Sequence, residues 1–166
     1  MRLALRRALT PPLSRREPGP PPNPPNPPDT FAFTINMASA GTYTLLTTGA
    51  VNYNVRWGDG SSETGVTDNN KTHAYAAAGD YQIEVTSTVA CRFYMNGNAT
   101  EGPRTKTVDY STFSATAAGS NLSNAWHGCS SLTSFPALPD TSQVTNFSAT
   151  WYGCSSLTSF SALPDT

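Results

Sequence analysis

The chain has 166 residues, with ten Lys and Arg against eleven Asp and Glu, a formal net charge of −1 and only 13% charged residues. A protein dedicated to DNA or RNA needs surplus positive charge to neutralise phosphates, so this balance excludes a nucleic-acid partner. No apolar run approaches the roughly 18 to 20 residues that a membrane-spanning helix requires, so no membrane span is expected.

The first thirty residues differ in composition from the rest. They hold ten of the fourteen prolines, most of them between Pro18 and Pro28, and five Arg against two acidic residues. Proline fixes φ and lacks an amide proton, so residues 1–30 are predicted to be a disordered, basic, Pro-rich leader or stalk. Arg6 and Arg7 interrupt the apolar start, so we recognise no signal peptide. A basic tether, a short amphipathic anchor and a plain disordered tail all remain open for this segment.

Apolar and polar residues alternate from Phe31 onward, which indicates half-buried β-strands. The expected strands lie within residues 31–37, 42–46, 51–57, 72–75 and 81–85. Turn signals separate them about every ten residues, a spacing typical of a small antiparallel sandwich. The fold class is therefore predicted to be mainly β.

A sharp turn is predicted where the strand that ends at Trp57 meets the sequence GDGS. Gly58 and Gly60 can take positive φ there, and the carboxylate of Asp59 can accept hydrogen bonds from nearby backbone amides. These three residues are therefore structural turn candidates.

The stretch WGDGS, with HAYAAAGDYQIEV downstream, resembles the paired signatures of the polycystic kidney disease (PKD) domain. That family is an immunoglobulin-like β-sandwich found in surface and secreted proteins. The resemblance implies a PKD-like sandwich over residues 31–90, core roles for Trp57, Tyr75 and Tyr81, and no catalytic residue.

Residues 121–166 contain an internal repeat, because residues 126–135 match residues 151–160 almost position for position at a spacing of 25. A unit this short cannot bury its own apolar side, so neighbouring units are expected to stack into a short solenoid of one complete and one truncated repeat. The expected inward-facing core positions are Trp126, Cys129, Leu132, Phe135 and Leu138 in the first unit, and Trp151, Cys154, Leu157, Phe160 and Leu163 in the second.

The phrase WYGCSSLTSFSALPDT, together with the SQVTNFS before it, resembles the units of BspA-like leucine-rich-repeat surface proteins. Proteins of that group often place a PKD-like domain before the repeats, with a short aromatic-Asn-Gly link between them. Residues 91–120 are accordingly expected to form a connector. The resemblance implies an extracellular or cell-surface location and a role in adhesion. Because a solenoid normally needs three or more repeats, we expect either a fragment or self-association through the uncapped repeat end.

Catalysis, zinc and other cofactors find little support in the sequence. The two histidines, His73 and His127, have no motif that would fix a serine beside either ring, so no enzyme is predicted. Asp59, Glu63 and Asp68 share one loop region and would suit calcium, but turn capping and solvation explain the same acids. No cofactor is therefore assigned, with calcium left open.

The cysteines leave two alternatives. Cys129 and Cys154 occupy equivalent positions in adjacent repeats, where they would be either buried thiols or a disulfide, and Cys91 makes the count odd. Nothing in the sequence alone decides between them.

Together these features predict a non-enzymatic, surface-exposed adhesion or binding protein that presents its repeats to a protein or glycan partner. His127 and Tyr152 are the candidate surface contacts, because they differ between otherwise matching repeats. Two alternatives remain: a structural component of a virion or other extracellular assembly, and an accessory carbohydrate-binding module.

Overall fold

The computed structural model describes residues 29–49, 52–87, 92–95, 97–112, 121–138, 141 and 144–161. All of the expected stalk except its last two residues lies outside this part, as do Cys91, Leu163 and residues 113–120 of the expected connector. Within the described residues the chain is mainly β, as the alternation predicted.

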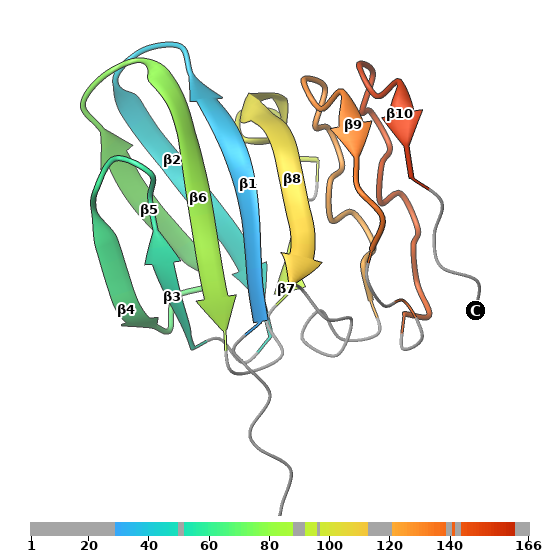
Figure 1. The fold of residues 1–166 in the computed structure, drawn as a ribbon, viewed down its shortest axis with the longest axis horizontal. Helices are drawn as coiled ribbons and strands as arrows, with labels where there is room; N and C mark the ends of the chain where they lie inside the picture. Colours follow the sequence, from blue (N-terminus) through green and yellow to red (C-terminus); the bar gives the residue numbers. More distant parts are fainter. Residues whose placement is uncertain are drawn as a thin grey trace, which may run out of the picture.

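The larger sheet has five antiparallel strands in the order β4-β3-β6-β1-β8 (Figure 1). They are β1 (Asp29–Met37), β3 (Tyr53–Arg56), β4 (Ser62–Val66), β6 (Gly79–Ser87) and β8 (Thr105–Thr112). The central pair, β1 and β6, runs in register over its whole length, from Asp29 opposite Ser87 to Met37 opposite Gly79. This long pairing makes β1 and β6 the centre of the sheet.

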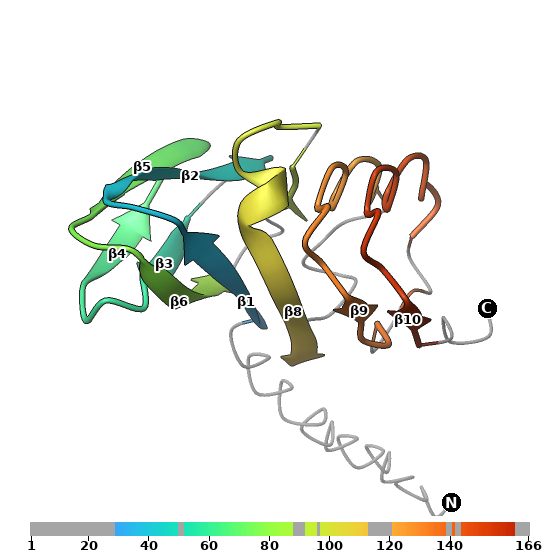
Figure 2. The ribbon, with the colours of Figure 1, turned by 90° about the horizontal axis from the view of Figure 1, so that it is seen from above.

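The smaller sheet has three antiparallel strands in the order β5-β2-β7, and it lies across the larger sheet as a second layer (Figure 2). Its strands are β2 (Gly41–Thr48), β5 (Asn70–Tyr75) and β7 (Arg92–Phe93). Alternate residues of both sheets point into the space between them, as in β2, where Tyr43, Leu45 and Thr47 are buried. The two layers form an antiparallel β-sandwich.

Aromatic rings fill much of this core. Phe33 lies between Tyr43 and Phe93, with ring centroids 6.2 Å and 4.8 Å away, and the fully buried Trp57 stacks on the ring of His73. Each such side chain contributes about 1.5 to 3 kcal/mol relative to an exposed one. The core of the sandwich therefore rests on large rings from both sheets.

Three strands of the sandwich, β4, β7 and β8, were not among those expected from the alternation. β4 contains Gly65 at φ 63°, and the register with β3 shifts beside it, so the alternation is too irregular to be recognised. β7 and β8 come from the segment expected to be a connector, yet β7 pairs with β2 and β8 pairs with β1. The sheets thus use residues beyond the expected 31–90.

The 25-residue repeats form two coils that lie one on the other beyond β8 (Figures 1 and 2). Two short strands, β9 (Ser134–Phe135) and β10 (Ser159–Phe160), pair in parallel, and Asn121 bridges Asn146 in the same parallel sense. Both pairings join residues exactly one repeat apart. The described residues thus contain two stacked coils rather than an extended solenoid.

Candidate binding surface

The two coils are built by the same turns, as the repeat requires. The Oδ1 atom of Asn121 accepts a hydrogen bond from the Ser123 amide at 2.8 Å, and that of Asn146 accepts one from the Ser148 amide at 2.8 Å. Further along, Gly128 and Gly153 take positive φ angles of 80° and 77°. Because glycine adopts this conformation without steric cost, both coils reverse direction at the same place.

Backbone hydrogen bonds connect the inner coil, which begins at Asn121, to the outer coil, which begins at Asn146. The amides of Leu122, Trp126 and Gly128 donate to carbonyls of the outer coil at 2.8 to 2.9 Å. In each bond, the residue that follows the acceptor is the one that matches the donor in the next repeat. This offset is the pattern of a parallel ladder. The inner coil therefore fixes the position of the outer one.

Burial decreases from the inner coil to the outer coil. Four of the five residues expected at inward positions of the inner coil are between 0% and 1% exposed, and the fifth, Leu138, is 5% exposed; the four are Trp126, Cys129, Leu132 and Phe135. Their counterparts Trp151, Cys154 and Leu157 are only partly buried, and Phe160, although expected in the core, is 44% exposed. This difference has a simple cause, since no other described residues cover the far side of the outer coil.

The segment expected to be a connector closes the other side of the inner coil. The Met95 amide donates to the Ala125 carbonyl at 2.8 Å, just as the Trp126 amide donates to Thr150 at 2.9 Å. Gly97 takes a φ of 70° in line with the glycines of both coils. We call residues 92–104 the cap segment, because Met95 and Gly97 occupy the places of the repeat tryptophan and glycine.

A buried carboxylate fastens the cap segment to the sandwich. Glu101 is 4% exposed, and its Oε1 atom accepts a hydrogen bond from the Thr44 amide of β2 at 3.0 Å. Its Oε2 atom lies 2.9 Å from Arg104, whose guanidinium also donates to the Thr42 carbonyl at 2.9 Å. Glu101 directly precedes the short 3-10 helix η1 (Gly102–Arg104) and is its N-cap residue, and the pairing of its carboxylate compensates for its burial.

Sequence reasoning missed both Glu101 and the role of Met95. The only signal was the Asn-Gly pair at 96–97, which marks a turn but not a stacked coil. The cap segment shares only its glycine with the repeat motif. A comparison of residues at a fixed spacing therefore cannot find the cap segment.

His127 and Tyr152 lie in contact at the turn of each coil, between the repeat tryptophan and the repeat glycine. Their ring centroids are 5.1 Å apart in an edge-to-face arrangement, and Tyr152 is 71% exposed. His127 reaches toward the cap segment, since a Cβ atom on Gly97 would lie 2.8 Å from its Nδ1 atom. The two candidate contact residues therefore form one aromatic surface on the edge of the stack.

The expected turn residues of the sandwich form a polar cluster at the end of β3. The Ser61 hydroxyl donates to Asp59 Oδ1 at 2.5 Å, and His73 Nε2 lies 2.8 Å from Asp59 Oδ2. Burial raises the pKa of Asp59, but the hydrogen bonds from Ser61 and His73 outweigh it and lower the pKa to about 2. This carboxylate stays ionised and holds the turn.

This cluster does not have the order of a catalytic triad. A triad places the serine on one imidazole nitrogen and the carboxylate on the other. Here Nε2 of His73 faces both the Asp59 carboxylate and, at 3.4 Å, the Ser61 hydroxyl, which itself donates to the carboxylate. The cluster fastens the turn and differs from a triad, because Asp59 and Ser61 face the same imidazole nitrogen.

The aromatic residues expected in the core lie around the same turn. Trp57 is fully buried and stacks on His73 with centroids 4.7 Å apart, while the buried Tyr75 hydroxyl donates to the Trp57 carbonyl at 2.7 Å. Tyr81 is only partly buried, because it sits at the rim with its hydroxyl donating to Ala77. These contacts hold Gly58–Gly60 against the sandwich.

Two of the three acids considered for calcium, Asp59 and Glu63, have other partners for their carboxylates. Glu63 accepts a hydrogen bond from Trp57 Nε1 at 3.2 Å and pairs with Lys71 at 2.6 Å, which lowers the pKa of its carboxyl. Asp68 contributes its backbone carbonyl to the Tyr53 hydroxyl. Within the part of the chain that the structure describes, no group of three or more His, Cys, Asp or Glu residues is placed to hold a metal ion.

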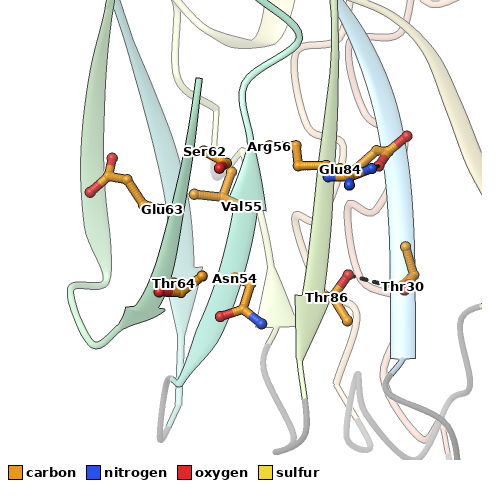
Figure 3. Close-up of a pocket in the computed structure, with 9 residues that line it drawn as sticks. All are labelled: Thr30, Asn54, Val55, Arg56, Ser62, Glu63, Thr64, Glu84 and Thr86. Carbon is orange, nitrogen blue, oxygen red and sulfur yellow. Dashed lines mark hydrogen bonds and ion pairs between the residues drawn. The ribbon is translucent and has the colours of Figure 1, made fainter. Parts of the chain in front are cut away.

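The outer face of the five-stranded sheet carries two shallow polar depressions of about 490 and 470 Å³, and Figure 3 shows the first of them. They share Arg56, Ser62 and Glu84, and the guanidinium of Arg56 lies 3.5 Å from the Glu84 carboxylate. Hydroxyl, amide and charged groups line both depressions, and Val55 also lines the first. The residues that line the two depressions could hydrogen-bond a polar ligand, and no aromatic ring is among them.

Cys129 and Cys154 are both free thiols. Cys129 is fully buried and Cys154 is half-buried, and the Cys154 thiol donates to the Trp126 carbonyl at 3.2 Å. The structure therefore shows the pair in its reduced form.

None of the described segments forms a helix that is long and apolar enough to cross a membrane. Comparisons of the chain with protein-family models, with curated proteins and with solved structures found no match. The function therefore has to be argued from the residues and their arrangement.

Proposed function

We propose that this chain is a non-enzymatic binding protein of the cell surface or extracellular space, in which a PKD-like sandwich carries a short leucine-rich-repeat stack. The edge of that stack presents His127 and Tyr152 to a protein or glycan partner. The resemblance to BspA-like surface proteins supports a role in adhesion, and the near-neutral charge fits a partner other than nucleic acid.

One observation carries this proposal: Tyr152 is 71% exposed, yet it stands on a rigid support. Its coil is bonded to the inner coil, the inner coil to the cap segment, and the cap segment to the sandwich through Glu101. Binding to a preorganised aromatic side chain loses little conformational entropy, which favours a contact residue at such a position.

The chemistry of the edge suits two classes of ligand. The ring of Tyr152 can stack on a sugar or pack against an apolar side chain, and its hydroxyl can donate a hydrogen bond. The ring nitrogens of His127 add a donor and an acceptor beside it. Tyrosine is also among the residues that most often dominate the binding energy of protein interfaces.

A printed glycan array and an array of extracellular-matrix proteins, both probed with the full chain, test the proposal. Tyr152→Ala and His127→Ala should each lower binding at least about tenfold, because truncating a central contact typically costs 1.4 kcal/mol or more. Arg56→Ala, on the outer face of the five-stranded sheet, is the matched control and should leave binding unchanged. Loss of glycan binding in Arg56→Ala alone would instead favour the carbohydrate-binding-module alternative.

A second candidate, a structural component of a virion or other extracellular assembly, is favoured by the far side of the outer coil. Phe160 is 44% exposed there, beside the partly buried Trp151 and Leu157. Such a face would serve self-association. Light scattering over a range of concentrations tests this candidate, which predicts association in the parent chain and a monomer in Phe160→Ser. If Phe160→Ser leaves the association unchanged, this face is not the interface.

A further inference from the structure

The two free thiols stand at equivalent positions of adjacent coils. Cys129 and Cys154 follow directly after Gly128 and Gly153, the glycines at which the coils turn. A Cβ atom built on Gly153 would lie only 3.4 Å from the Cα atom of Gly128, so the coils approach closely at this point. The cysteines are thus placed where the distance between the coils is short.

The spacing of parallel chains is compatible with a disulfide at this position. Neighbouring strands lie about 4.8 Å apart, and the Cα atoms of a disulfide are usually about 4.4 to 6.8 Å apart. Backbone hydrogen bonds of 2.8 Å and 2.9 Å from Gly128 and Trp126 hold the coils in this register. Closing the bond would therefore need a small shift of the side chains and no change in the pairing.

The two sulfurs also differ in reactivity. The Cys129 thiol and backbone amide can donate to the sulfur of Cys154, which lowers the pKa of Cys154, while the same contact and burial raise the pKa of Cys129. Cys154 is the more exposed of the two, since Cys129 is 0% exposed. The accessible sulfur is thus the one that more readily forms the nucleophilic thiolate.

We propose that Cys129 and Cys154 form a redox site, in which a small-molecule disulfide converts the two thiols into a disulfide between the coils. The site lies beneath the aromatic edge formed by His127 and Tyr152 and does not depend on the proposed binding function. Cys129 lies two positions after His127, and Cys154 lies two positions after Tyr152. The disulfide would therefore attach the outer coil, which carries Tyr152, covalently to the inner coil.

The exchange takes place in two balanced steps. The Cys154 thiolate attacks one sulfur of the small disulfide, forms a mixed disulfide and releases one small thiolate. Cys129 then loses its proton and attacks the Cys154 sulfur, which forms the Cys129–Cys154 bond and releases the second small thiolate. The two cysteines give up two electrons and two protons, and the small disulfide is reduced to two thiols.

This bond would act where the stack is weakest. The outer coil packs on one neighbour among the described residues, and its core positions are partly exposed. A cross-link that closes a loop of this size restricts the unfolded chain, so oxidation should raise the melting temperature by roughly 5 to 10 °C.

The test uses the full chain with Cys91→Ala, which removes the third thiol, and oxidised glutathione as the probe. The folded protein should lose the mass of two hydrogen atoms, and peptide mapping should find Cys129 linked to Cys154. Adding Cys129→Ala should trap one glutathione on Cys154, because the resolving thiol is gone. Adding Cys154→Ala should leave the buried Cys129 without an adduct.

Three results would overturn the proposal: two unreacted thiols in the folded Cys91→Ala chain, a stable glutathione adduct without the link, or adducts on Cys129 as fast as on Cys154. Circular dichroism on each variant shows whether it is folded. If an alanine variant fails to fold, the same comparison is made with Cys129→Ser and Cys154→Ser. Glutathione reactivity and the thiol link are measured without any partner, so they are independent of the outcome of the binding arrays.

Discussion

The sandwich and the coils bury their apolar side chains in different ways. In the sandwich, two sheets cover each other, so residues far apart in sequence, such as Phe33 and Phe93, meet in a core closed on both sides. In the coils, each unit is covered only by the next, so Trp126 is 1% exposed while its counterpart Trp151 is only partly buried. The same sequence motif therefore has a different environment in each copy.

Because of this difference, local stability should decrease from the sandwich through the inner coil to the outer coil. The sandwich and the inner coil belong to one continuous cluster of buried residues, which includes Phe93 and Met95 of the cap segment. The outer coil adds contacts to this cluster without being enclosed by it. In stacked repeats, stability is a sum of unit and interface terms, so a unit with one neighbour lacks one interface term.

The largest expected effect is in the sandwich. Trp57→Ala should lower the free energy of unfolding by about 3 to 5 kcal/mol, because it leaves a cavity and removes the stacking on His73. Urea unfolding followed by circular dichroism measures this loss. A Trp57→Ala chain with full stability would contradict the closed core of the sandwich.

The two repeat tryptophans test this difference between the coils directly, because they share a motif but differ in burial. Trp126→Ala should cost about 3 to 5 kcal/mol, and Trp151→Ala about half as much, since the exposed part of its ring gains little from folding. Urea unfolding of both variants, side by side, gives the ratio. Equal losses would mean that the outer coil is as well covered as the inner one.

The sequence predicts the sandwich well, and for a physical reason. Strands β1, β2, β3, β5 and β6 bury one face, so alternation marks them, and the glycines after Trp57 mark the end of a strand. Strand β4 is not recognised because Gly65 breaks its period, and β8 is not recognised because Val108 and Tyr110 are its only apolar residues. Pairing partners in a sheet are far apart in sequence and are not encoded locally.

The candidate surface was predicted only in part. Comparing the repeats singled out His127 and Tyr152 as the variable positions, and the structure brings their rings into contact. What the sequence could not indicate is the support beneath them. Met95, Gly97 and Glu101 do not share the repeat motif, so their place in the stack depends on hydrogen bonds that only the fold provides.

Gly102→Ala tests whether the cap segment sets the position of the coils. A Cβ atom there would lie 2.7 Å from the Gly128 carbonyl oxygen, a backbone atom that cannot move aside alone. The strain should cost about 1 to 3 kcal/mol and should fall mainly on the coils. Hydrogen exchange should show faster exchange at the coil amides of Trp126 and Gly128 than at those of β1.

The control for that variant is Gly60→Ala. Gly60 has a positive φ of 93° but no atoms within 4 Å of the Cβ position, so its cost is local backbone strain in the sandwich turn. Faster exchange across β1 in Gly102→Ala, with the coils unaffected, would contradict the role assigned to the cap segment.

A pH titration probes the sandwich alone, through Asp59. The folded-state pKa of about 2 lies below the usual value near 3.9, so the carboxylate stabilises the fold above about pH 4 and loses this contribution as the pH falls toward 2. Urea midpoints of the parent chain and Asp59→Asn should therefore converge between about pH 4 and pH 2. A difference that stays constant over this range would mean that Asp59 does not hold the turn through its charge.

The smallest expected effect is a gain in the outer coil. Ala149 has a φ of 52°, a left-handed conformation that costs an ordinary L-residue about 1 kcal/mol or more, while Asn124 occupies the same place in the inner coil at 56°. Asparagine tolerates this conformation better, so Ala149→Asn should raise stability by about 0.5 to 1 kcal/mol. The matched change, Asn124→Ala, should lower it by a similar amount. Thermal melts of both variants measure the two changes in melting temperature. The two positions share one left-handed backbone conformation, so the melting temperature should rise for Ala149→Asn and fall for Asn124→Ala. Shifts in the same direction would contradict this explanation.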